Sequence, residues 1–503
     1  MADVNSVFLS PENGNTVCSR PIGDKTTIID VADRDEMDDK LFPLTSDISW
    51  FIRKAGRRVL PFTPVLQEFT YKGTAEFGNR LVFECGSVNA GDILFTVALQ
   101  IKLGHWLPPQ AQEYVQSGRY TYVNRSDAWF YANSLGTSLI ESAEFMLEDQ
   151  TIERIDGDFT NIISNLYADI NSQIGISTDA FGIYSNSELS VWNLQQLYPT
   201  TNGYITCILP FSFQRIRRQE GFPLLSVKEG TVRFAITLKS FDNVVRQVTP
   251  QLIDHGTGGS PLNMTTQFYD NSVSPRTIVS VTTDPNPPRF TDVRLLTSGV
   301  MVDGKFRTAL IHTPFERLYR EVQSFRFDEP LKYSTLVSED QINIQLPLEL
   351  NHPIEEIVWV IRRKAVSLTN NWTNYSGVLE WNTDPVFNPT RGLLKYGVIQ
   401  VNGEPIIEGS GDFFRQSIAE CHRGGITAYT NYIYGYSFSR NPGKHNPSGT
   451  INTSRMTDIR LRLSIEPPND VNPISNEWEV LVYAVALNWI RYEKGIANKL
   501  FSS

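Results

Sequence analysis

Histidine and cysteine, which often bind metals or attack substrates, are sparse and scattered in this sequence of 503 residues. No two histidines stand at the spacing of metal ligands, and no cysteines form a Cys-x-x-Cys pair. His352, between Asn351 and Pro353, is interpreted as a turn residue and not as a ligand. The pattern predicts no metal site and no disulfide framework, which is typical of a reducing compartment. The histidines are His105, His255, His312, His352, His422 and His445, and the cysteines are Cys18, Cys85, Cys207 and Cys421.

Carboxylates and glycines provide only weak candidates for catalysis or phosphate binding. Asp156-Gly157-Asp158 could supply half of a carboxylate pair, but a β-turn is the favoured interpretation. Residues 256–259 form a lone glycine loop and are not interpreted as a phosphate cradle. The motifs HExxH, GxxxxGK[ST] and GxSxG are missing from the sequence, as is a Rossmann fingerprint after a strand. We therefore expect no catalytic, cofactor-binding or metal-binding residues, no cofactor, and a protein that is not an enzyme.

The charge balance argues against a face that binds nucleic acid. The 45 Lys and Arg residues are outnumbered by 55 Asp and Glu residues, for a net charge of -10. Residues 33–39 are acidic and are interpreted as a solvated arm or exposed turn and not as a cation site. Residues 53–58 are basic and are interpreted as surface or interface charge and not as a nucleic-acid contact. Arg215-Ile216-Arg217-Arg218 is predicted to make a salt contact between subunits and not to bind DNA. No direct nucleic-acid partner is expected.

Five asparagines stand in the N-glycosylation pattern, and two of them, Asn371 and Asn374, lie in a predicted surface loop. Those two are the candidate glycosylation sites. The N-terminus shows no signal-peptide pattern, so no glycan from the secretory pathway is expected. The longest apolar run, residues 480–487, is shorter than the roughly 18 residues that span a bilayer, so no membrane span is predicted. The five asparagines are Asn124, Asn263, Asn371, Asn374 and Asn452.

The elements that would position these residues are predicted to be strands. Residues 95–103, 232–239, 342–350 and 459–465 alternate apolar with polar side chains, as half-buried strands do. Residues 478–490 are rich in β-branched and aromatic residues and predict a buried last strand. The chain holds 33 glycines and 28 prolines, which favour many turns between short strands. The predicted fold class is all-β.

Composition divides the chain into an N-terminal arm and two domains. Residues 1–60 show weak strand alternation and are predicted to form the arm. Asp284-Pro285-Asn286-Pro287-Pro288 is predicted to be a linker, because three prolines cannot join a ladder and favour an extended spacer. The boundary is placed there, which gives a first domain at residues 61–284 and a second at residues 285–503.

A few stretches depart from the strand pattern. Helical periodicity appears at residues 162–170, and a short helix is predicted around residues 315–319. Residues 254–276 and 364–432 are rich in Gly, Ser, Asn and Pro and are predicted to be long surface loops.

Five segments resemble, in the right order, segments of the major capsid proteins of nucleocytoplasmic large DNA viruses. The most specific is residues 434–455, which is similar to the family segment written YSF…P…QPSGT.N.SR. Residues 351–360 are similar to NHPVKELIWV, although Glu355 stands where the family often has Lys. Ser212 stands where an aromatic residue is usual, Asn446 replaces the Gln of QPSGT, and residues 1–60 match no family segment. The other similar segments are residues 129–145, 208–225 and 401–403.

The resemblance implies a double jelly roll, that is, two tandem eight-stranded antiparallel sandwiches with long loops and few short helices. It further implies a homotrimeric, pseudo-hexagonal capsomer that tiles the icosahedral shell of a large double-stranded DNA virus. The implied partners are other copies of the chain, neighbouring trimers, and minor capsid and penton proteins. The implied location is the virion, assembled in the host cytoplasm and next to an internal membrane that the chain does not span. Residues 254–276 and 364–432 are the candidates for the outward crown, and the N-terminal arm is expected to face inward.

Two alternatives stay open from the sequence. A capsid paralogue with a minor or vertex role would show the same motifs, because copy number is not encoded in a pattern. A two-domain carbohydrate-binding or glycan-cleaving β-sandwich protein would need an acidic pair facing a groove.

Overall fold

The structure is a computed structural model. It describes residues 62–501 apart from 104–107, 124–128, 133, 168–203, 216–220, 248–264, 283–289, 291, 329–341, 369, 378–391, 423–431, 445 and 466–477. Residues Phe62–Ser503 form one compact unit. The predicted N-terminal arm, the proline linker at 284–288, and Arg217 and Arg218 lie outside the described residues.

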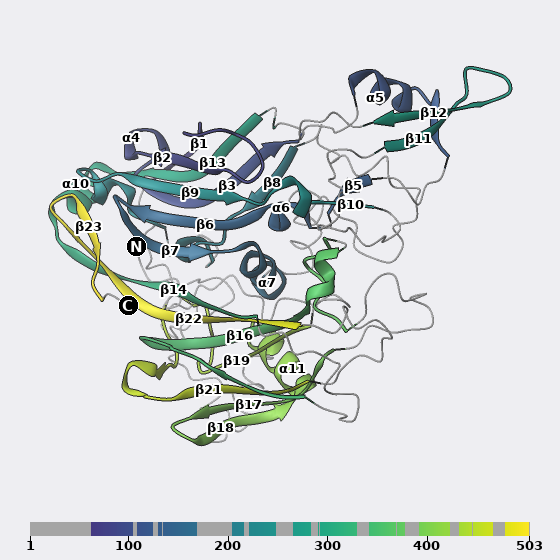
Figure 1. Ribbon diagram of the computed structural model, residues 1–503. Coiled ribbons are helices and arrows are strands. Elements are labelled where there is room, and N and C mark those ends of the chain that lie inside the picture. The colour runs from purple at the N-terminus through teal and green to yellow at the C-terminus, as the bar shows by residue number, and fades with distance from the viewer. Residues whose placement is uncertain are drawn as a thin grey trace, which may run out of the picture. The chain divides into compact units, whose positions relative to one another are not determined.

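The described residues fold into two antiparallel β-sandwiches, and Figure 1 shows four sheets stacked in succession. In the first sandwich the strand orders are β1-β13-β3-β8 and β2-β9-β6-β7. In the second they are β14-β22-β16-β19 and β15-β21-β17-β18, with β20 and β23 added at the margins of the first of these sheets. If the eight strands of each sandwich are numbered along the chain, both sandwiches read 1-8-3-6 and 2-7-4-5. The two sandwiches therefore share one jelly-roll topology.

The bounds of these elements are as follows. The first sandwich has β1 (Phe62–Phe69), β2 (Arg80–Cys85), β3 (Ile93–Lys102), β6 (Ile140–Leu147), β7 (Gln150–Ile155), β8 (Tyr204–Ile208), β9 (Val232–Leu238) and β13 (Asp292–Val302). The second has β14 (Phe315–Phe327), β15 (Ile342–Pro347), β16 (Pro353–Arg363), β17 (Leu394–Val401), β18 (Glu404–Ser410), β19 (Ile433–Ser437), β20 (Ile451–Asn452), β21 (Ile459–Ile465), β22 (Trp478–Glu493) and β23 (Ile496–Lys499).

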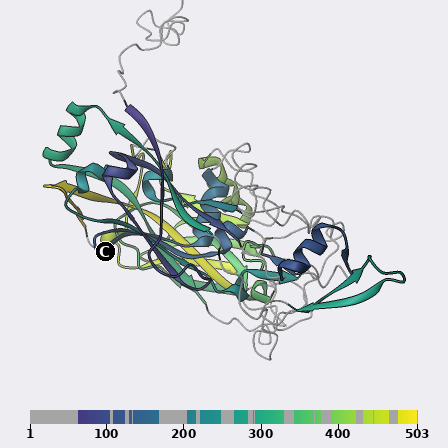
Figure 2. The same cartoon turned by 90° about the horizontal axis from the view of Figure 1, so that it is seen from above.

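Helices and small strands fill the connections. The α-helices are α4 (Ser87–Ala90), α5 (Pro109–Gln116), α6 (Leu135–Ser138), α7 (Gly157–Tyr167), α9 (Ser212–Arg215), α10 (Gly304–His312) and α11 (Gly411–His422). The 3-10 helices are η3 (Leu224–Val227), η4 (Phe241–Asn243), η7 (Lys364–Leu368) and η9 (Thr453–Arg455). The small strands are β4 (Tyr120–Tyr122), β5 (Trp129–Tyr131), β10 (Val245–Gln247), β11 (Thr265–Asp270) and β12 (Thr277–Thr282). In both views the β11–β12 hairpin lies at the opposite end from α10 (Figures 1 and 2).

Strand β13 bears on where the first domain ends. It follows the predicted boundary at residue 284 in the chain, yet it pairs with β1 and β3 of the first sandwich. It is the eighth strand of that sandwich, so a cut at residue 284 would remove the strand between β1 and β3. The division into two domains stays a prediction, and we propose to move its boundary to the turn after Val302, where α10 leads to β14.

The alternating patterns fold as strands because each has one face in a core. In β9, Val232, Phe234, Ile236 and Leu238 are buried and belong to the first core. β22 differs, because nearly all of its residues are buried. Val480 and Val482 face the core of the second sandwich, whereas Leu481 and Tyr483 pack with the residues of the first. The sheet that holds β22 is thus covered on both faces.

Several predicted elements are wrong in detail. The predicted loop at 254–276 contains the strand β11, and the predicted loop at 364–432 contains β17, β18 and α11. The helix expected at residues 315–319 is the start of strand β14, and the helix α10 lies just before it. The helical periodicity predicted at 162–170 is confirmed as far as Tyr167 by α7 (Gly157–Tyr167), and residues 168–170 lie outside the described residues. Among the described residues, no helix is long and apolar enough to cross a membrane.

Candidate functional site

A layer of buried charged side chains lies between the two sandwiches. Strand β16 alone buries four charged residues, Glu355, Glu356, Arg362 and Arg363, each at most 1% exposed. Burying an unpaired charge costs several kcal/mol, so each of these groups needs a partner. We call the polar side chains that provide the partners the seam. It comprises Glu153, Asp156, Asp158, Tyr167, Arg215, Arg320, Glu355, Glu356, Arg362, His422, Glu479 and Tyr483.

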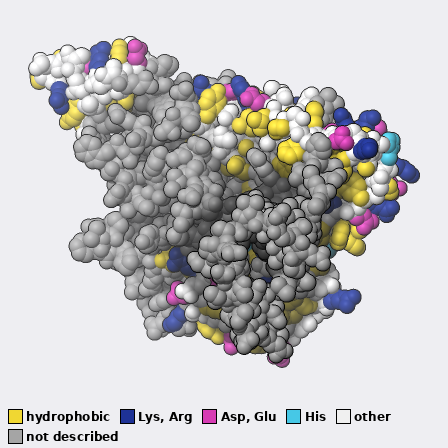
Figure 3. Space-filling view, turned by 180° about the vertical axis from the view of Figure 1, so that it is seen from behind, with side chains coloured by type: hydrophobic (Ala, Val, Ile, Leu, Met, Phe, Trp, Pro, Cys, Tyr) yellow, Lys and Arg dark blue, Asp and Glu magenta, His cyan; other side chains and the backbone are white. Residues whose placement is uncertain are grey.

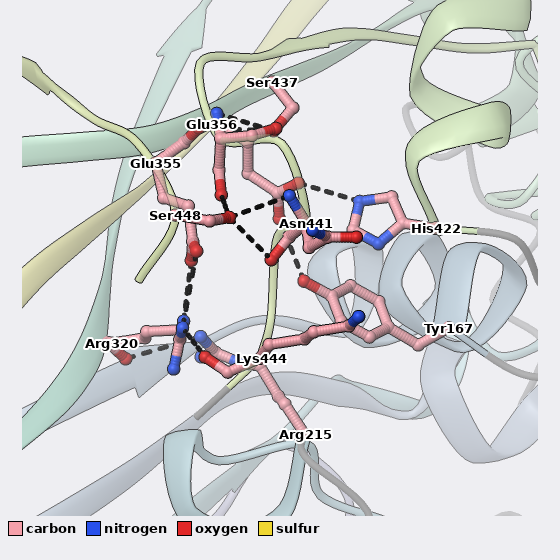
Figure 4. A network of polar contacts seen from close by, with 11 residues as sticks. Tyr167, Arg215, Arg320, Glu355, Glu356, His422, Ser437, Asn441, Lys444 and Ser448 are labelled. Atoms are coloured by element: carbon pink, nitrogen blue, oxygen red, sulfur yellow. Dashed lines mark hydrogen bonds and ion pairs between the residues drawn. The ribbon is translucent and has the colours of Figure 1, made fainter. Parts of the chain in front are cut away.

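The first part of the seam consists of two ion pairs, one on each of two arginines, that are joined by a hydrogen bond (Figure 4). Arg320 on β14 bonds Glu355 on β16, with Nε 2.6 Å from Oε2. Arg215 on α9 pairs with Glu153 on β7, and its Nη1 donates to the backbone oxygen of Arg320 at 3.3 Å. The prediction that Arg215 makes a contact between subunits is therefore wrong, because its partners lie in its own chain. They join α9 of the first sandwich to β14 of the second.

The second part is a buried triad of Tyr167, Glu356 and His422 (Figure 4). The Glu356 carboxylate accepts a hydrogen bond from the Tyr167 hydroxyl at 3.0 Å and lies 2.7 Å from Nε2 of His422. Burial acts to raise the pKa of Glu356, but the charge and hydrogen bond of His422 outweigh it and hold this pKa below its usual value. Since Tyr167 ends α7 and His422 ends α11, the triad fixes helices from both sandwiches against β16.

The third part is built on the acidic pair at the start of α7. Asp156 caps this helix, because its Oδ1 accepts the backbone N–H of Phe159 at 2.7 Å, and it also accepts the Tyr483 hydroxyl. Asp158 lies 2.6 Å from Nη1 of Arg362, which in turn bonds Glu479 at 2.6 Å. Asp156-Gly157-Asp158 is thus a helix start and not the β-turn expected from sequence. Burial, followed by the charge of Asp158, raises the pKa of Asp156 to about 6.

The loop between β19 and β20, which resembles the family signature, covers this seam. Ser448 Oγ accepts the backbone N–H of Asn441 at 2.8 Å and lies 2.7 Å from Ser439 Oγ, which closes the loop on itself. The backbone oxygen of Lys444 accepts a hydrogen bond from Arg320. Gly443 has φ +70, and a Cβ there would lie 2.7 Å from Cε1 of Tyr167. A glycine is required here because the backbone has a positive φ and because Tyr167 of the seam leaves no room for a Cβ.

The segment that holds the candidate glycosylation sites is packed and not exposed. Asn371 is 6% exposed and Asn374 4% exposed, so the predicted surface loop is wrong at this point. Next to them, the Trp372 indole donates to the backbone oxygen of Asn243 at 2.7 Å. Oδ1 of Asn374 accepts the backbone N–H and the hydroxyl of Ser376. A glycan at either asparagine would require this segment to leave its packing against η4, and modification there stays an untested prediction.

These groups can hold the sandwiches together, but they offer little for catalysis. In the described ranges, no three His, Cys, Asp or Glu residues are placed to hold a metal ion. A pocket between the sandwiches, lined by residues such as Phe145, Arg317 and Tyr492, has a volume of ≈ 20 Å³. That is room for about one water. His352 has φ +68, so its interpretation as a turn residue is confirmed.

Sequence reasoning missed the seam because its partners are far apart in the chain. Arg362 and Asp158 are separated by 204 residues, and Glu356 and Tyr167 by 189. One signal was present: the pairs Glu355-Glu356 and Arg362-Arg363 flank an apolar strand of five residues, 357–361. Charges that border a strand buried on both faces must find buried partners.

Comparisons with known proteins agree with this architecture. Residues 307–498 match the family described as large eukaryotic DNA virus major capsid protein. The major capsid protein of Phaeocystis pouchetii virus is 22% identical over 550 aligned residues, which cover 89% of this chain and 94% of that protein. The probable capsid protein 4 of Acanthamoeba polyphaga mimivirus is 26% identical, but the match spans only 42% of this chain and 40% of that protein.

Solved structures support the same fold. The PBCV-1 capsid protein VP54 superposes with a TM-score of 0.62 at 16% identity, over 90% of this chain and all of that one. The Faustovirus major capsid protein gives a TM-score of 0.58 at 12% identity, over 93% of this chain and 96% of that one. At such identities the likeness to solved structures shows the fold alone. With two jelly rolls of one topology and a signature loop that covers the seam between them, the chain is similar in fold, and over residues 307–498 in sequence, to large eukaryotic DNA virus major capsid proteins.

Proposed function

We propose that this chain is the main building block of the shell of a large double-stranded DNA virus. Three copies assemble into a capsomer of nearly hexagonal outline. The observation that carries the proposal is the pairing of two sandwiches of identical strand order through a seam of buried ion pairs. A trimer of such chains presents six similar sandwiches, and hexagonal blocks can tile the facets of a closed shell. The role is structural, in line with a family of capsid proteins and not of enzymes.

Exposed apolar side chains support contacts between copies. Seen from behind, hydrophobic side chains gather on the part of the molecule that holds the first sandwich (Figure 3). Leu66 and Phe62 on the edge strand β1 are 80% and 56% exposed, and Ile208 on β8, the opposite edge of the same sheet, is 44% exposed. Exposed apolar patches on soluble proteins often mark surfaces that bind other proteins. This sheet is therefore our candidate for a face that meets another subunit.

The remaining parts of the proposal concern the assembled particle. Contacts between trimers are individually weak and sum over the shell, so no single strong interface is needed. Minor capsid and penton proteins are the proposed neighbours, and the N-terminal arm, residues 1–60, faces them from the inner side. The shell is assembled in the host cytoplasm beside an internal membrane. The β11–β12 hairpin belongs to the proposed outward crown.

Light scattering on a sizing column tests the assembly proposal. We expect full-length recombinant protein to elute with the mass of three chains and to keep that mass on dilution. Leu66→Asp, which places a charge on the proposed contact face, should shift the protein toward the monomer. Val273→Asp serves as the matched control, because it makes the same change from an exposed apolar side chain to a negative charge outside that sheet. A wild-type protein that stays monomeric with and without co-expressed viral chaperones would contradict the proposal.

Copy number separates a major from a minor role. Quantitative mass spectrometry of purified virions should find this chain as the most abundant shell protein. A chain present at only the few copies needed for vertices would instead identify a minor paralogue.

A further inference from the structure

The C-terminal hairpin contains a second buried polar cluster that the seam does not use. Glu321 on β14 is 4% exposed, and its Oε2 forms an ion pair with Nζ of Lys499 at 2.7 Å and accepts a hydrogen bond from Nδ2 of Asn488 at 3.2 Å. Lys499 lies on β23 and Asn488 on β22, the strands of the hairpin that ends the chain. An amine and an amide are thus held against the same carboxylate oxygen. Because Nζ of Lys499 and Nδ2 of Asn488 both contact Oε2 of Glu321, the distance between these two nitrogen atoms cannot exceed the sum of the two contact distances.

The amide of Asn488 is fixed in orientation by further contacts. Its Oδ1 accepts the backbone N–H of Trp489 at 2.7 Å, and its Nδ2 also donates to the backbone oxygen of Phe501 at 2.9 Å. The carbonyl oxygen therefore faces a hydrogen-bond donor, while the amide nitrogen faces the carboxylate. In amide chemistry this arrangement stabilises negative charge on the oxygen and favours proton transfer to the departing nitrogen.

We propose that Lys499 and Asn488 form an intramolecular isopeptide bond, with Glu321 as the group that moves the protons. Glu321 takes a proton from the Lys499 ammonium, and the free amine attacks Cγ of Asn488 to form the Nζ–Cγ bond. Negative charge develops on Oδ1, where the N–H of Trp489 stabilises it. Glu321 passes its proton to Nδ2 and takes a second proton from Nζ. The Cγ–Nδ2 bond then breaks and ammonia leaves, so the reaction needs no oxidant and no cofactor.

The surroundings hold the three groups together and shield them from water. The side chains of Lys499 and Glu321 are 11% and 6% exposed, and Asn488 is 1% exposed. Little water therefore reaches the amine, the carboxylate or the amide. The other oxygen of Glu321 faces His352, at 3.4 Å, and Gln323, at 3.5 Å, so the carboxylate cannot turn away from the amine without losing partners. Tyr319 also donates to Oε2, at 3.1 Å.

The bond would join the last strand covalently to its neighbour. β23 pairs only with β22 in the described part of the sheet, so it is held to the sheet from one side. It also carries contacts to the first sandwich, because the backbone oxygen of Gly495, in the turn of the hairpin, accepts the N–H of Glu229 at 3.0 Å. A covalent link would keep the hairpin on both sandwiches during assembly.

Intact mass spectrometry of the full-length protein tests the proposal. We expect the wild-type chain to weigh less than its sequence predicts by one molecule of ammonia. Digestion should yield a branched peptide that joins Lys499 to residue 488. The loss should be absent in Glu321→Gln and in Lys499→Arg, while Lys494→Arg, at an exposed lysine of the same hairpin, should keep it.

The variants are compared only where circular dichroism shows a folded protein. Because the wild-type mass decides the question, a variant that fails to fold does not remove the test. A wild-type chain that keeps its full sequence mass after prolonged incubation, with no branched peptide, would overturn the proposal and leave a buried ion pair.

Discussion

The core of the second sandwich and the seam beside it are two faces of the same strands, yet they are built from different chemistry. Alternate residues of β22, such as Val480 and Val482, enter the hydrophobic core of the second sandwich. On the opposite face, Tyr483 and Glu479 meet Asp156 and Arg362. An apolar core accepts any set of side chains that fills its volume. Buried ion pairs accept only partners in register, so the seam selects one docking position for the two sandwiches.

The strongest test of this comparison removes one charge from the seam. Arg362→Met keeps the volume but leaves Asp158 and Glu479 without their shared cation. Breaking a buried pair from one side costs about 3–5 kcal/mol, so we expect urea denaturation to show a loss of that size. Arg460→Met is the control, because Arg460 is 45% exposed in its pair with Asp458 and such pairs contribute about 0–1 kcal/mol. Equal losses in the two variants would mean that charge does not hold the seam.

Acidity should act in opposite directions on two parts of the seam. The folded-state pKa of Asp156 is raised to about 6, so the stability that this group contributes is present at pH 4 and is lost as the pH rises through 6. The pKa of Glu356 is lowered, so its contribution is present at neutral pH and is lost as the pH falls through that pKa.

Replacing each acid by its amide separates the two effects. Relative to wild type, Asp156→Asn should gain about 1–3 kcal/mol between pH 4 and pH 7, and it keeps a residue that caps helices well. Glu356→Gln should lose stability relative to wild type over the same rise in pH. Urea midpoints measured across this range give both signs. Parallel pH profiles for the two variants would refute the assignment of the two groups.

An effect no larger than that of Asp156→Asn is expected in the loop that covers the seam. Gly443→Ala places a Cβ against Tyr167 and forces a left-handed backbone on alanine, which should cost about 1–3 kcal/mol. Gly304→Ala is the matched control, because no atom lies within 4 Å of its added Cβ and its φ is unstrained. It should change the free energy of unfolding by no more than about 1 kcal/mol. A control that costs as much as Gly443→Ala would show that the loop does not depend on this close approach.

The strands could be predicted from sequence because their signal is local. The alternation in residues 232–238 and 459–465 needs only one buried face, and both stretches are strands. The identities of the seam partners could not be predicted, because whether a charged residue is buried depends on a partner that is distant in the sequence and comes close only in the folded chain. Arg215 therefore looked like a surface cation, and Asn371 and Asn374 looked like loop residues. The family resemblance supplied the double jelly roll that local patterns left open.

The strand order has a consequence for the time at which each half can fold. Among the described strands of each sandwich, the first pairs only with the last, as β1 does with β13 and β14 with β22. A ribosome that has made β14 must add about 150 further residues before the partner strand appears, so the second half stays open for most of its synthesis. The first half is complete by then and can offer its acidic and aromatic surface to the emerging arginines. The folded first half of the nascent chain would thus provide the surface on which the second half folds and docks.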